Sequence, residues 1–353
     1  MQQYGVATVA QLDQFAEIID VRTPSEYAED HIPGAINCPV LDDAQRAEVG
    51  TLYKQVSPFE ARKLGAALVA VNIAHHLRQQ FAAKPKEWRP LVYCWRGGQR
   101  SGAMEIILRQ VGWKACKLEG GYKAYRHRVL EGLDELPGRF TLQVISGPTG
   151  SGKTRLLQAI AREGGQILNL EALACHKGSV LGLCPGQQQP SQKAFETALW
   201  QQLEALDPAR PLFVEAESRK VGRLALPTAL LTAMAAGRRQ PVAVPMEARV
   251  AYLLEDYDYF LTDQEALLAR LERLKELVGK EVLGCWQSLI ATGDWPALVA
   301  DLLQRHYDPL YQRSLRHYGP ENGNGAAPLA LDSLDEATLT RAARELLAAS
   351  PAL

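Results

Sequence analysis

The chain has 353 residues, 47% of them hydrophobic, and a formal net charge of −1. This length allows two or three domains, and the balanced charge excludes a protein that binds nucleic acid through its overall charge. Any contact with tRNA or DNA has to come from local patches.

No apolar run is long enough to span a membrane, because the richest one, residues 224–236, is broken by Pro227. The N-terminus lacks the charged-then-apolar pattern of a secretion signal. Six cysteines are scattered without a Cys-x-x-Cys pair, which is typical of a reducing compartment and argues against disulfides and zinc knuckles. Cys175, His176 and Cys184 lack a fourth ligand at useful spacing, so we expect no structural metal. We therefore predict a cytoplasmic protein.

The first part of the chain alternates short helices and strands. Residues 8–16 predict a helix and residues 17–21 a strand. Thr23-Pro-Ser-Glu26 is a capping box with proline at the first helical position, so a helix begins there and ends near residue 30. Residues 31–37 then turn into another strand.

A helical insertion is expected at about residues 41–80. A second capping box, Ser57-Pro-Phe-Glu60, opens a helix that continues to the end of this insertion. Its core face is predicted from the apolar residues that recur at helical spacing, which are Leu64, Leu68, Val71 and Leu77.

The stretch Val92-Tyr-Cys-Trp-Arg-Gly-Gly-Gln-Arg-Ser101 places Cys94 at the mouth of a loop between a strand and a helix at residues 102–110, which Ser101 can cap. Backbone N–H groups and the positive end of the helix dipole favour a thiolate there. Gly97 and Gly98 let the backbone curl into an anion nest, to which Arg96 and Arg100 add fixed charge. We interpret the loop as a site for an anionic sulfur, or for an anion bonded to it. The alternative is a buried structural cysteine.

This part of the chain resembles the rhodanese (sulfurtransferase) family. The matching motifs are Asp20-Val-Arg22, Glu26-Tyr27, His31-Ile-Pro-Gly-Ala-Ile-Asn37, Cys94, and Glu119-Gly-Gly-Tyr122 with Tyr125. The resemblance implies that Cys94 carries a transferable sulfur as a persulfide, an anion that needs donors on all sides.

The cysteine loop departs from many rhodaneses by one residue, because five residues separate Cys94 from Arg100. This longer spacing is that of the related rhodanese-fold phosphatases, and it also suits a larger atom such as selenium. A phosphatase therefore remains an alternative for this domain taken alone.

Gly147-Pro-Thr-Gly-Ser-Gly-Lys-Thr154 is a complete P-loop between a predicted strand, residues 140–145, and a helix, residues 155–162. Its backbone N–H groups can wrap a phosphate chain, which Lys153 neutralises, while Thr154 can ligate Mg²⁺. The expected phosphate-binding residues are Gly147, Gly150, Ser151, Gly152, Lys153 and Thr154. The loop recognises polyphosphate geometry, so ATP, GTP and an organic diphosphate all remain candidate ligands.

A later predicted strand, residues 212–217, ends in carboxylates. Glu217, or Glu215, is the candidate to hold a metal ion or its waters together with Thr154. The alternative is a pair of solvated strand-end acids. Residues 242–246 predict a further strand and residues 247–256 the next helix, so this half predicts a parallel, doubly wound sheet.

Basic residues follow the acidic strand end and recur near the C-terminus. Each group is more often a solvated helix face than a binding site, so they do not predict RNA binding by themselves. The candidate tRNA contacts are Arg219, Lys220, Arg223, Arg313 and Arg316, with Tyr307, Tyr311 and Tyr318 available for base stacking. Residues 267–277 predict an amphipathic surface helix and residues 336–347 a final helix.

A rhodanese domain followed by a P-loop domain resembles the tRNA 2-selenouridine synthase family. Three segments extend the resemblance over nearly the whole chain: residues 94–101, Gly50-Thr-Leu-Tyr-Lys54 with Ser57-Pro-Phe59, and Gln189-Pro-Ser-Gln-Lys193. It implies a transferase that replaces the sulfur of wobble 2-thiouridine in tRNA by selenium from selenophosphate, through an S-geranyl intermediate made from geranyl diphosphate.

The same resemblance implies roles for the two sites. Cys94 would carry selenium as a perselenide, and Arg96, Arg100 and the Gly97–Gly98 nest would stabilise it. The P-loop would hold geranyl diphosphate, with Mg²⁺ as a candidate cofactor and with tRNA and a selenophosphate supplier as partners.

We expect an α/β fold with a rhodanese-like N-terminal domain built on a parallel sheet at residues 1–133. A P-loop NTPase-like, doubly wound domain with a helical C-terminal region follows at residues 138–320, and a C-terminal helix and tail at residues 321–353. Two other functions stay open: a sulfurtransferase coupled to a P-loop kinase acting on a small molecule, and a non-catalytic, nucleotide-dependent binding protein.

Overall fold

The computed structural model describes residues 5–183, 186–317 and 326–350. Its internal contacts divide the chain into two compact units. The first unit contains residues Met1–Gly132 and Pro190–Thr197, and the second contains Leu133–Gln189 and Ala198–Leu353. The first unit therefore includes eight residues that follow the P-loop in the sequence.

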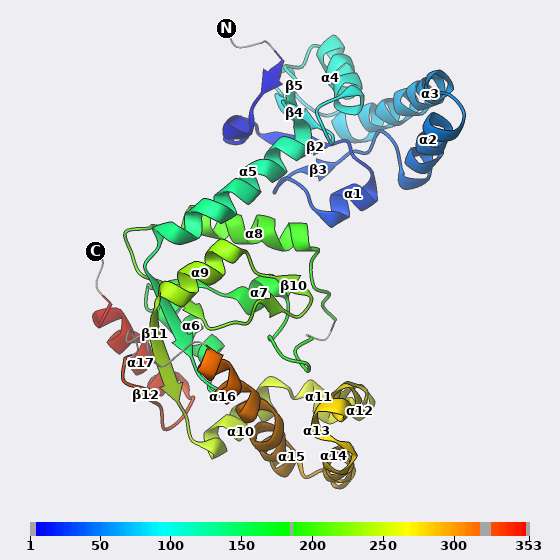
Figure 1. Cartoon of the computed structure of the whole chain (residues 1–353). Coiled ribbons are helices and arrows are strands. Elements are labelled where there is room, and N and C mark those ends of the chain that lie inside the picture. The colour runs from blue at the N-terminus through cyan, green and yellow to red at the C-terminus, as the bar shows by residue number, and fades with distance from the viewer. Residues whose placement is uncertain (1–4, 184–185, 318–325, 351–353) are drawn as a thin grey trace. The chain divides into compact units, whose positions relative to one another are not determined.

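The first unit is built on a five-stranded sheet in the order β1-β5-β4-β2-β3, and all of its strand pairs are parallel (Figure 1). The central strand β4 is buried at all four positions, as expected for a parallel sheet covered on both faces. The strands are β1 (Val6–Ala7), β2 (Glu17–Asp20), β3 (Ile36–Asn37), β4 (Pro90–Tyr93) and β5 (Cys116–Leu118). The predicted parallel sheet of a rhodanese-like domain is confirmed.

The helices of this unit begin where their capping residues predict. In the first capping box, Glu26 N donates to Thr23 Oγ1 at 3.3 Å and Thr23 N donates to Glu26 Oε2 at 3.0 Å. Ser57 is the N-cap residue of α3, and its hydroxyl accepts from Phe59 N and Glu60 N. The predicted return bond from Glu60 is not formed, because the Glu60 carboxylate pairs with Lys63 instead. The helices are η1 (Val9–Gln14), α1 (Pro24–Glu29), α2 (Asp43–Gln55), α3 (Pro58–His76), η2 (Leu77–Phe81), α4 (Gln99–Val111) and α5 (Gly121–Glu135).

The predicted core face of α3 is correct at three of its four positions, because Leu64, Leu68 and Leu77 are half-buried. Val71 is 69% exposed, so its assignment to the core was wrong. Ala61, Ile73 and His76 are the buried positions of this helix. His76 is accommodated because its Nε2 lies 2.9 Å from the carbonyl oxygen of Pro39.

The second unit is built on a parallel sheet in the order β12-β11-β6-β8-β7. This order puts β6, which precedes the P-loop, beside β8, which ends at Glu215. Since parallel strands end at the same edge, the P-loop and the acidic strand end lie together there. The strands are β6 (Leu142–Ser146), β7 (Gln166–Leu168), β8 (Leu212–Glu215), β11 (Arg238–Ala243) and β12 (Leu329–Ala330). The predicted doubly wound parallel sheet is confirmed, although β11 begins four residues before the predicted strand at 242.

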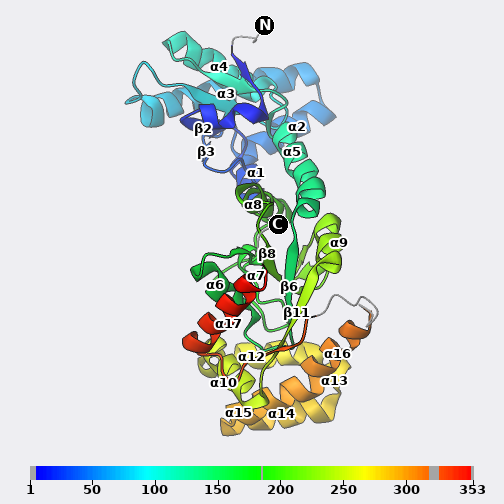
Figure 2. The same ribbon diagram turned by 90° about the vertical axis from the view of Figure 1, so that its left-hand side faces the viewer.

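Helices pack on both faces of this sheet. Figure 2 shows α6 (Lys153–Arg162) and α17 (Glu336–Ala348) on one side and α9 (Thr228–Ala236) on the other. Leu156 and Ile160 of α6 share a core with Leu339 and Ala343 of α17. By its packing, α17 is therefore part of the P-loop fold.

Short helices complete the second unit. The surface helix predicted at residues 267–277 is broken into α12 (Gln264–Leu271), η4 (Glu272–Leu274) and α13 (Lys275–Val278), with Leu271 and Leu274 buried. The others are η3 (Leu136–Arg139), α7 (Leu170–Ala174), α10 (Met246–Asp256), α11 (Tyr259–Thr262), α14 (Lys280–Thr292), α15 (Trp295–Leu302), η5 (Leu303–Tyr307) and α16 (Asp308–His317), beside a two-stranded ribbon of β9 (Lys220–Val221) and β10 (Leu224–Ala225). Helix α8 (Gln192–Ala205) begins in the first unit and continues into the second from Ala198 onward. In the part of the chain that the structure describes, no helix has the length and apolar character needed to cross a membrane.

Candidate active sites

Cys94 follows β4 directly and lies in the loop that leads into α4. Its side chain is only 3% exposed, and its Sγ lies 3.2 Å from Ser101 Oγ. The prediction that Ser101 caps a helix starting at residue 102 was wrong, because α4 already begins at Gln99 with Gly98 as its N-cap residue. Ser101 is therefore inside the first turn, where its hydroxyl is a polar partner for the buried sulfur.

Two glycines let the closing motif pack against the cysteine loop. Gly97 and Gly121 have φ angles of +65° and +60°, which favour glycine. A Cβ atom on Gly121 would collide with the carbonyl oxygen of Cys94 and the nitrogen of Gly97. Tyr122 N donates to that Cys94 carbonyl at 2.8 Å. The segment that resembles the rhodanese closing motif thus packs directly against the cysteine loop and hydrogen-bonds to it.

The two arginines of the loop have different surroundings. Arg100 makes a bidentate ion pair with Glu26, with N···O distances of 2.6 and 3.1 Å. Burial alone would raise the pKa of Glu26, but the hydrogen bond and charge of Arg100 outweigh burial and lower this pKa. Arg96 is exposed. Arg96 is thus an exposed cation of the loop, whereas Glu26 already balances the charge of Arg100.

A buried ion pair between Arg22 and Asp20 packs against Tyr122 of the closing motif. Arg22 and Asp20 are 1% and 0% exposed and are joined by an N···O contact of 2.6 Å. The Arg22 guanidinium lies 4.0 Å from the ring centroid of Tyr122. Asp30 Oδ2 accepts a hydrogen bond from the hydroxyl of the same tyrosine at 2.6 Å.

Residues Pro190–Thr197 complete this part of the first unit. Thr197 Oγ1 donates to Asp30 Oδ2 at 3.0 Å, so Asp30 binds this segment and Tyr122 together. Lys193 pairs with Glu29 at 2.8 Å, and its Nζ lies 5.7 Å from the ring centroid of Trp95, the residue after Cys94. The contacts of Lys193 attach this segment to the cysteine loop.

The P-loop lies between β6 and α6, as predicted. Gly150 and Gly152 have φ angles of +81° and +69°. Gly152 packs so closely against Leu334 that a Cβ atom on this glycine would lie 2.7 Å from the leucine side chain. Lys153 Nζ donates to the carbonyl oxygens of Gly147 and Pro148 at 3.0 and 3.4 Å. The lysine side chain is therefore folded back onto its own loop, where its positive charge would neutralise a bound phosphate chain.

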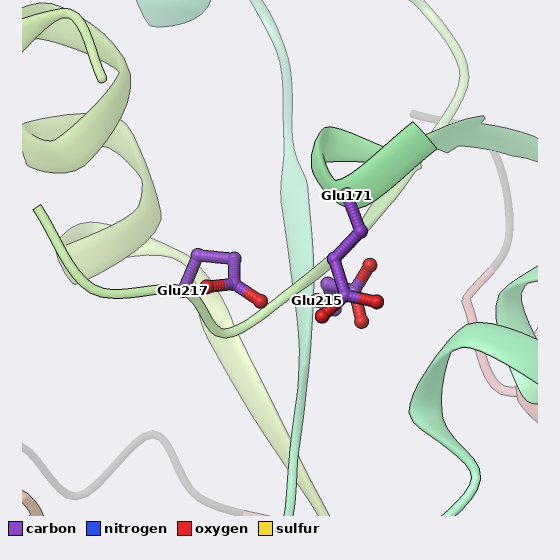
Figure 3. Close-up of side chains that lie close together, drawn as sticks. All are labelled: Glu171, Glu215 and Glu217. Carbon is purple, nitrogen blue, oxygen red and sulfur yellow. The ribbon is translucent and has the colours of Figure 1, made fainter. Parts of the chain in front are cut away.

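The carboxylates of three glutamates lie close together (Figure 3). Glu171 comes from α7, Glu215 from the end of β8, and Glu217 from the segment that follows. One carboxylate oxygen of each lies within 4.8 Å of those of the other two. The Thr154 hydroxyl lies 3.1 Å from Glu171 Oε2 and 3.0 Å from Glu215 Oε2. The sequence named Thr154 with Glu217 or Glu215, and the structure brings all of them together.

The surroundings of these glutamates suit a divalent cation. Burial, followed by the charge of a neighbouring glutamate, raises the pKa of Glu171 to about 8 and the pKa values of Glu215 and Glu217 to about 7. Glu215 Oε1 is buried and has no hydrogen-bond partner among the described residues. Three carboxylates and a hydroxyl are the oxygen ligands that Mg²⁺ prefers, and a bound cation would satisfy the orphaned oxygen.

Glu171 was missed by sequence reasoning. Its distance along the chain from the P-loop follows no motif, and its only signal is an acid within the otherwise apolar run Leu170–Ala174. Within the ranges that the structure describes, these three glutamates form the one candidate cluster of metal-ligating side chains. Cys184, which the sequence grouped with Cys175 and His176, lies outside the described residues.

The P-loop and the three glutamates line a cavity of about 1060 Å³. Arg219 and Lys220 also line it, together with Tyr307 and Tyr311. Arg223 is held at the neighbouring segment, where its guanidinium donates to the carbonyl oxygen of Gln189 at 2.6 Å. The structure thus places two candidate tRNA contacts, Arg219 and Lys220, in the cavity of the acidic cluster, and the third, Arg223, at a neighbouring pocket that Lys220 also lines.

The remaining candidate tRNA contacts lie on or beyond α16. Arg313 is exposed on this helix, but the side chain of Arg316 and the whole of Tyr318 lie outside the described residues.

Comparisons with known families match two stretches of this chain. The family described as "tRNA 2-selenouridine synthase AAA domain" matches residues 140–277, and the rhodanese-like domain family matches residues 7–128. A rhodanese-related protein from Thermoplasma volcanium, of known structure, matches 35% of this chain and 93% of its own with 19% identity and a TM-score of 0.24.

Two curated relatives are named tRNA 2-selenouridine synthase. The protein from Nitrosomonas europaea is 38% identical over 244 residues, which span 68% of this chain but only 63% of the relative. The protein from Bdellovibrio bacteriovorus is 32% identical over 349 residues, covering 84% of this chain and 88% of the relative. The chain belongs to the tRNA 2-selenouridine synthase family.

Proposed function

We propose that the protein replaces the sulfur of wobble 2-thiouridine in tRNA by selenium, using selenophosphate, through an S-geranyl-2-thiouridine intermediate made from geranyl diphosphate. One observation carries the proposal. A chain of this family combines a buried cysteine loop with a P-loop whose threonine lies among three carboxylates. The first arrangement suits an anion bonded to sulfur, and the second suits a diphosphate with a divalent cation.

The first step belongs to the P-loop cavity. The sulfur of 2-thiouridine attacks C1 of the geranyl group, the C1–O bond breaks, and its electron pair leaves with the diphosphate. The N3 proton of the base passes to solvent. Lys153 and the backbone N–H groups of the P-loop neutralise the departing diphosphate. Thr154, Glu171, Glu215 and Glu217 would hold Mg²⁺, which supplies further positive charge to that leaving group.

The second step belongs to the cysteine loop. The selenium of selenophosphate attacks C2 of the base, a C2–Se bond forms, and the C2–S bond breaks, so that geranylthiolate leaves and takes the proton of the Cys94 thiol, which solvent then restores. Water attacks the phosphorus, the P–Se bond breaks with its electron pair going to selenium, and phosphate leaves. The loop glycines Gly97 and Gly98, with Arg96, would stabilise the selenium anion. Arg100 is held in position by its ion pair with Glu26 and can add its positive charge to the stabilisation of that anion.

The tRNA would be held by basic side chains near the P-loop site. Arg219 and Lys220 line the same cavity as the acidic cluster, Arg223 lies in the neighbouring pocket with Lys220, and all three carry the charge that a phosphate backbone needs. Contacts of this kind release counterions, so the affinity for tRNA should fall steeply with salt concentration.

The proposal is tested by incubating the protein with 2-thiouridine tRNA, geranyl diphosphate, Mg²⁺, selenophosphate and a thiol, followed by mass analysis of the nucleosides. The wild type should form selenouridine, Cys94→Ala should accumulate geranyl-thiouridine, and Lys153→Ala should form neither. A wild type that leaves thiouridine unchanged and phosphorylates a small molecule with ATP would replace this proposal by a kinase coupled to a sulfurtransferase. Hydrolysis of an aryl phosphate that depends on Cys94 and Arg100 would instead identify a phosphatase.

A further inference from the structure

One helix beside the P-loop cavity has an unusual composition for its position. Helix α9, with the sequence TALLTAMAA, contains no charged residue. Thr228, Leu231, Thr232 and Ala235 lie at positions i, i+3, i+4 and i+7, which share one face, and all four line the cavity. Three of them are exposed and Leu231 is half-buried. A solvent-accessible helix face normally carries charges, and this one carries none.

The same wall continues beyond the helix. Ala225 and Leu226 of the preceding segment and Leu310 of α16 also line the cavity. The hydroxyl of Thr232 donates to the carbonyl oxygen of Thr228 at 3.0 Å, so it is already engaged within the helix. We call the surface formed by Ala225, Leu226, Thr228, Leu231, Thr232, Ala235 and Leu310 the α9 wall.

The cavity is therefore divided in character. The P-loop with Lys153 and the three glutamates forms a strongly polar part, and the α9 wall forms an apolar part of the same space. A ligand with a diphosphate head and a hydrocarbon tail matches both parts. A nucleoside would place its base and sugar hydroxyls against a wall that offers few hydrogen-bond partners, and unpaired polar groups are costly to bury.

We propose that the α9 wall binds the hydrocarbon chain of a prenyl diphosphate and that Leu231 sets the preferred chain length. The inference rests on the proposed geranyl transfer and adds the location of the chain and a specificity-determining residue. The cavity volume of about 1060 Å³ accommodates a ligand of this size. Each methylene that gains or loses a place in an apolar site changes kcat/KM by roughly ten-fold or more.

A binding experiment tests the wall without requiring catalysis. The affinities of inorganic diphosphate and geranyl diphosphate are measured by calorimetry, each with Mg²⁺. The wild type should bind geranyl diphosphate at least about ten-fold more tightly. Leu231→Asp should bind inorganic diphosphate like the wild type, which also shows that it is folded, and should lose the preference for the geranyl compound. Leu277→Asp is the matched control, because Leu277 is 70% exposed and lies outside the cavity lining.

A competition experiment tests the chain-length assignment. Dimethylallyl, geranyl and farnesyl diphosphates compete for transfer to 2-thiouridine tRNA, and the products are weighed. Leu231→Trp should shift the ratio toward the five-carbon donor by about ten-fold or more, because the larger side chain shortens the space along the wall. Leu277→Trp should keep the wild-type ratio.

The outcomes separate the inference from the proposed function. If the wild type transfers no prenyl group, the proposed function fails. If it transfers geranyl groups while both Leu231 variants keep the wild-type preferences, the chain lies elsewhere and only the α9 wall is overturned. Equal affinity of the wild type for inorganic and geranyl diphosphate would also overturn the wall.

Discussion

At the scale of single residues, Glu215 shows how burial prepares a cation site. Its side chain is 1% exposed, and one of its oxygens finds no hydrogen-bond partner in the described parts of the chain. Burial and the charge of Glu217 raise its pKa, while Lys153 and Thr154 offset only part of that effect. A cation bound to the three glutamates would reverse the raised pKa values and stabilise the fold.

The metal-free protein should therefore lose stability as pH rises. The three pKa values lie at about 7 to 8 in the folded state, above the ordinary value of 4.5, so the folded state binds more protons between these limits. The contribution of these three carboxyl groups to the free energy of unfolding is therefore complete below about pH 4.5. This contribution is lost as pH rises through 7 to 8. Melting temperatures measured with a chelator at pH 5, 7 and 9 should fall, and Mg²⁺ should restore them most at pH 9.

Glu215→Gln provides the variant for this measurement. A raised pKa means that the ionised carboxylate destabilises the fold at pH 9, by about 1.4 kcal/mol for each pKa unit. Glutamine cannot ionise, so the metal-free variant should melt higher than the wild type at pH 9 and should gain less from Mg²⁺. Glu276→Gln changes an exposed glutamate of α13 and should behave like the wild type. A chelated wild type whose melting temperature does not fall between pH 5 and 9 would contradict this description of the cluster.

The Cys94–Ser101 contact gives a second prediction at this scale. A hydrogen bond to a charged group contributes about 1.5–3 kcal/mol, so Ser101→Ala should slow alkylation of Cys94 by iodoacetamide roughly ten-fold. Peptide mass analysis follows each cysteine separately, and the exposed Cys285 serves as an internal control. Equal rates at Cys94 in the variant and the wild type would show that Ser101 does not assist the sulfur.

At the scale of elements, the segment Pro190–Thr197 supports the rhodanese unit. Asp30 is 4% exposed and accepts hydrogen bonds from both Thr197 and Tyr122. Thr197→Val keeps the shape and removes one of them, which should cost about 1–3 kcal/mol. Hydrogen exchange should speed up in the cysteine loop and the closing motif. Thr292→Val, at an exposed threonine bonded within its own helix, is the control. Unchanged exchange in Thr197→Val would mean that the segment does not support the loop.

Features set by neighbouring residues were predictable from the sequence at this scale. The capping box at Thr23, the N-cap at Ser57 and the P-loop between strand and helix follow from local chemistry, and the structure has each of them. Glu171 and Thr197 acquire their partners only when distant parts of the chain fold together, and no local pattern marks them. Val71 fits the same helical apolar pattern as Leu64 and Leu68, yet Val71 is 69% exposed while the two leucines are half-buried.

At the scale of the whole molecule, one chain carries two chemically different sites. The cysteine site contains a buried sulfur held by glycines and a closing motif, and the P-loop site contains a cation cluster and an apolar wall. The proposed reaction assigns one step to each. The fold class, the P-loop and the cysteine loop were predictable from the sequence, whereas Glu171 and the α9 wall became visible only in the structure.

The division of labour between the two sites is tested most directly by giving the steps to two inactive variants in sequence. Cys94→Ala first treats 2-thiouridine tRNA with geranyl diphosphate and Mg²⁺, and the tRNA is purified. Lys153→Ala then receives this tRNA with selenophosphate and a thiol. We predict that neither variant alone forms selenouridine from thiouridine and that the sequence in this order does. If Lys153→Ala leaves the geranylated tRNA unchanged while the wild type converts it, the assignment of one step to each site is contradicted.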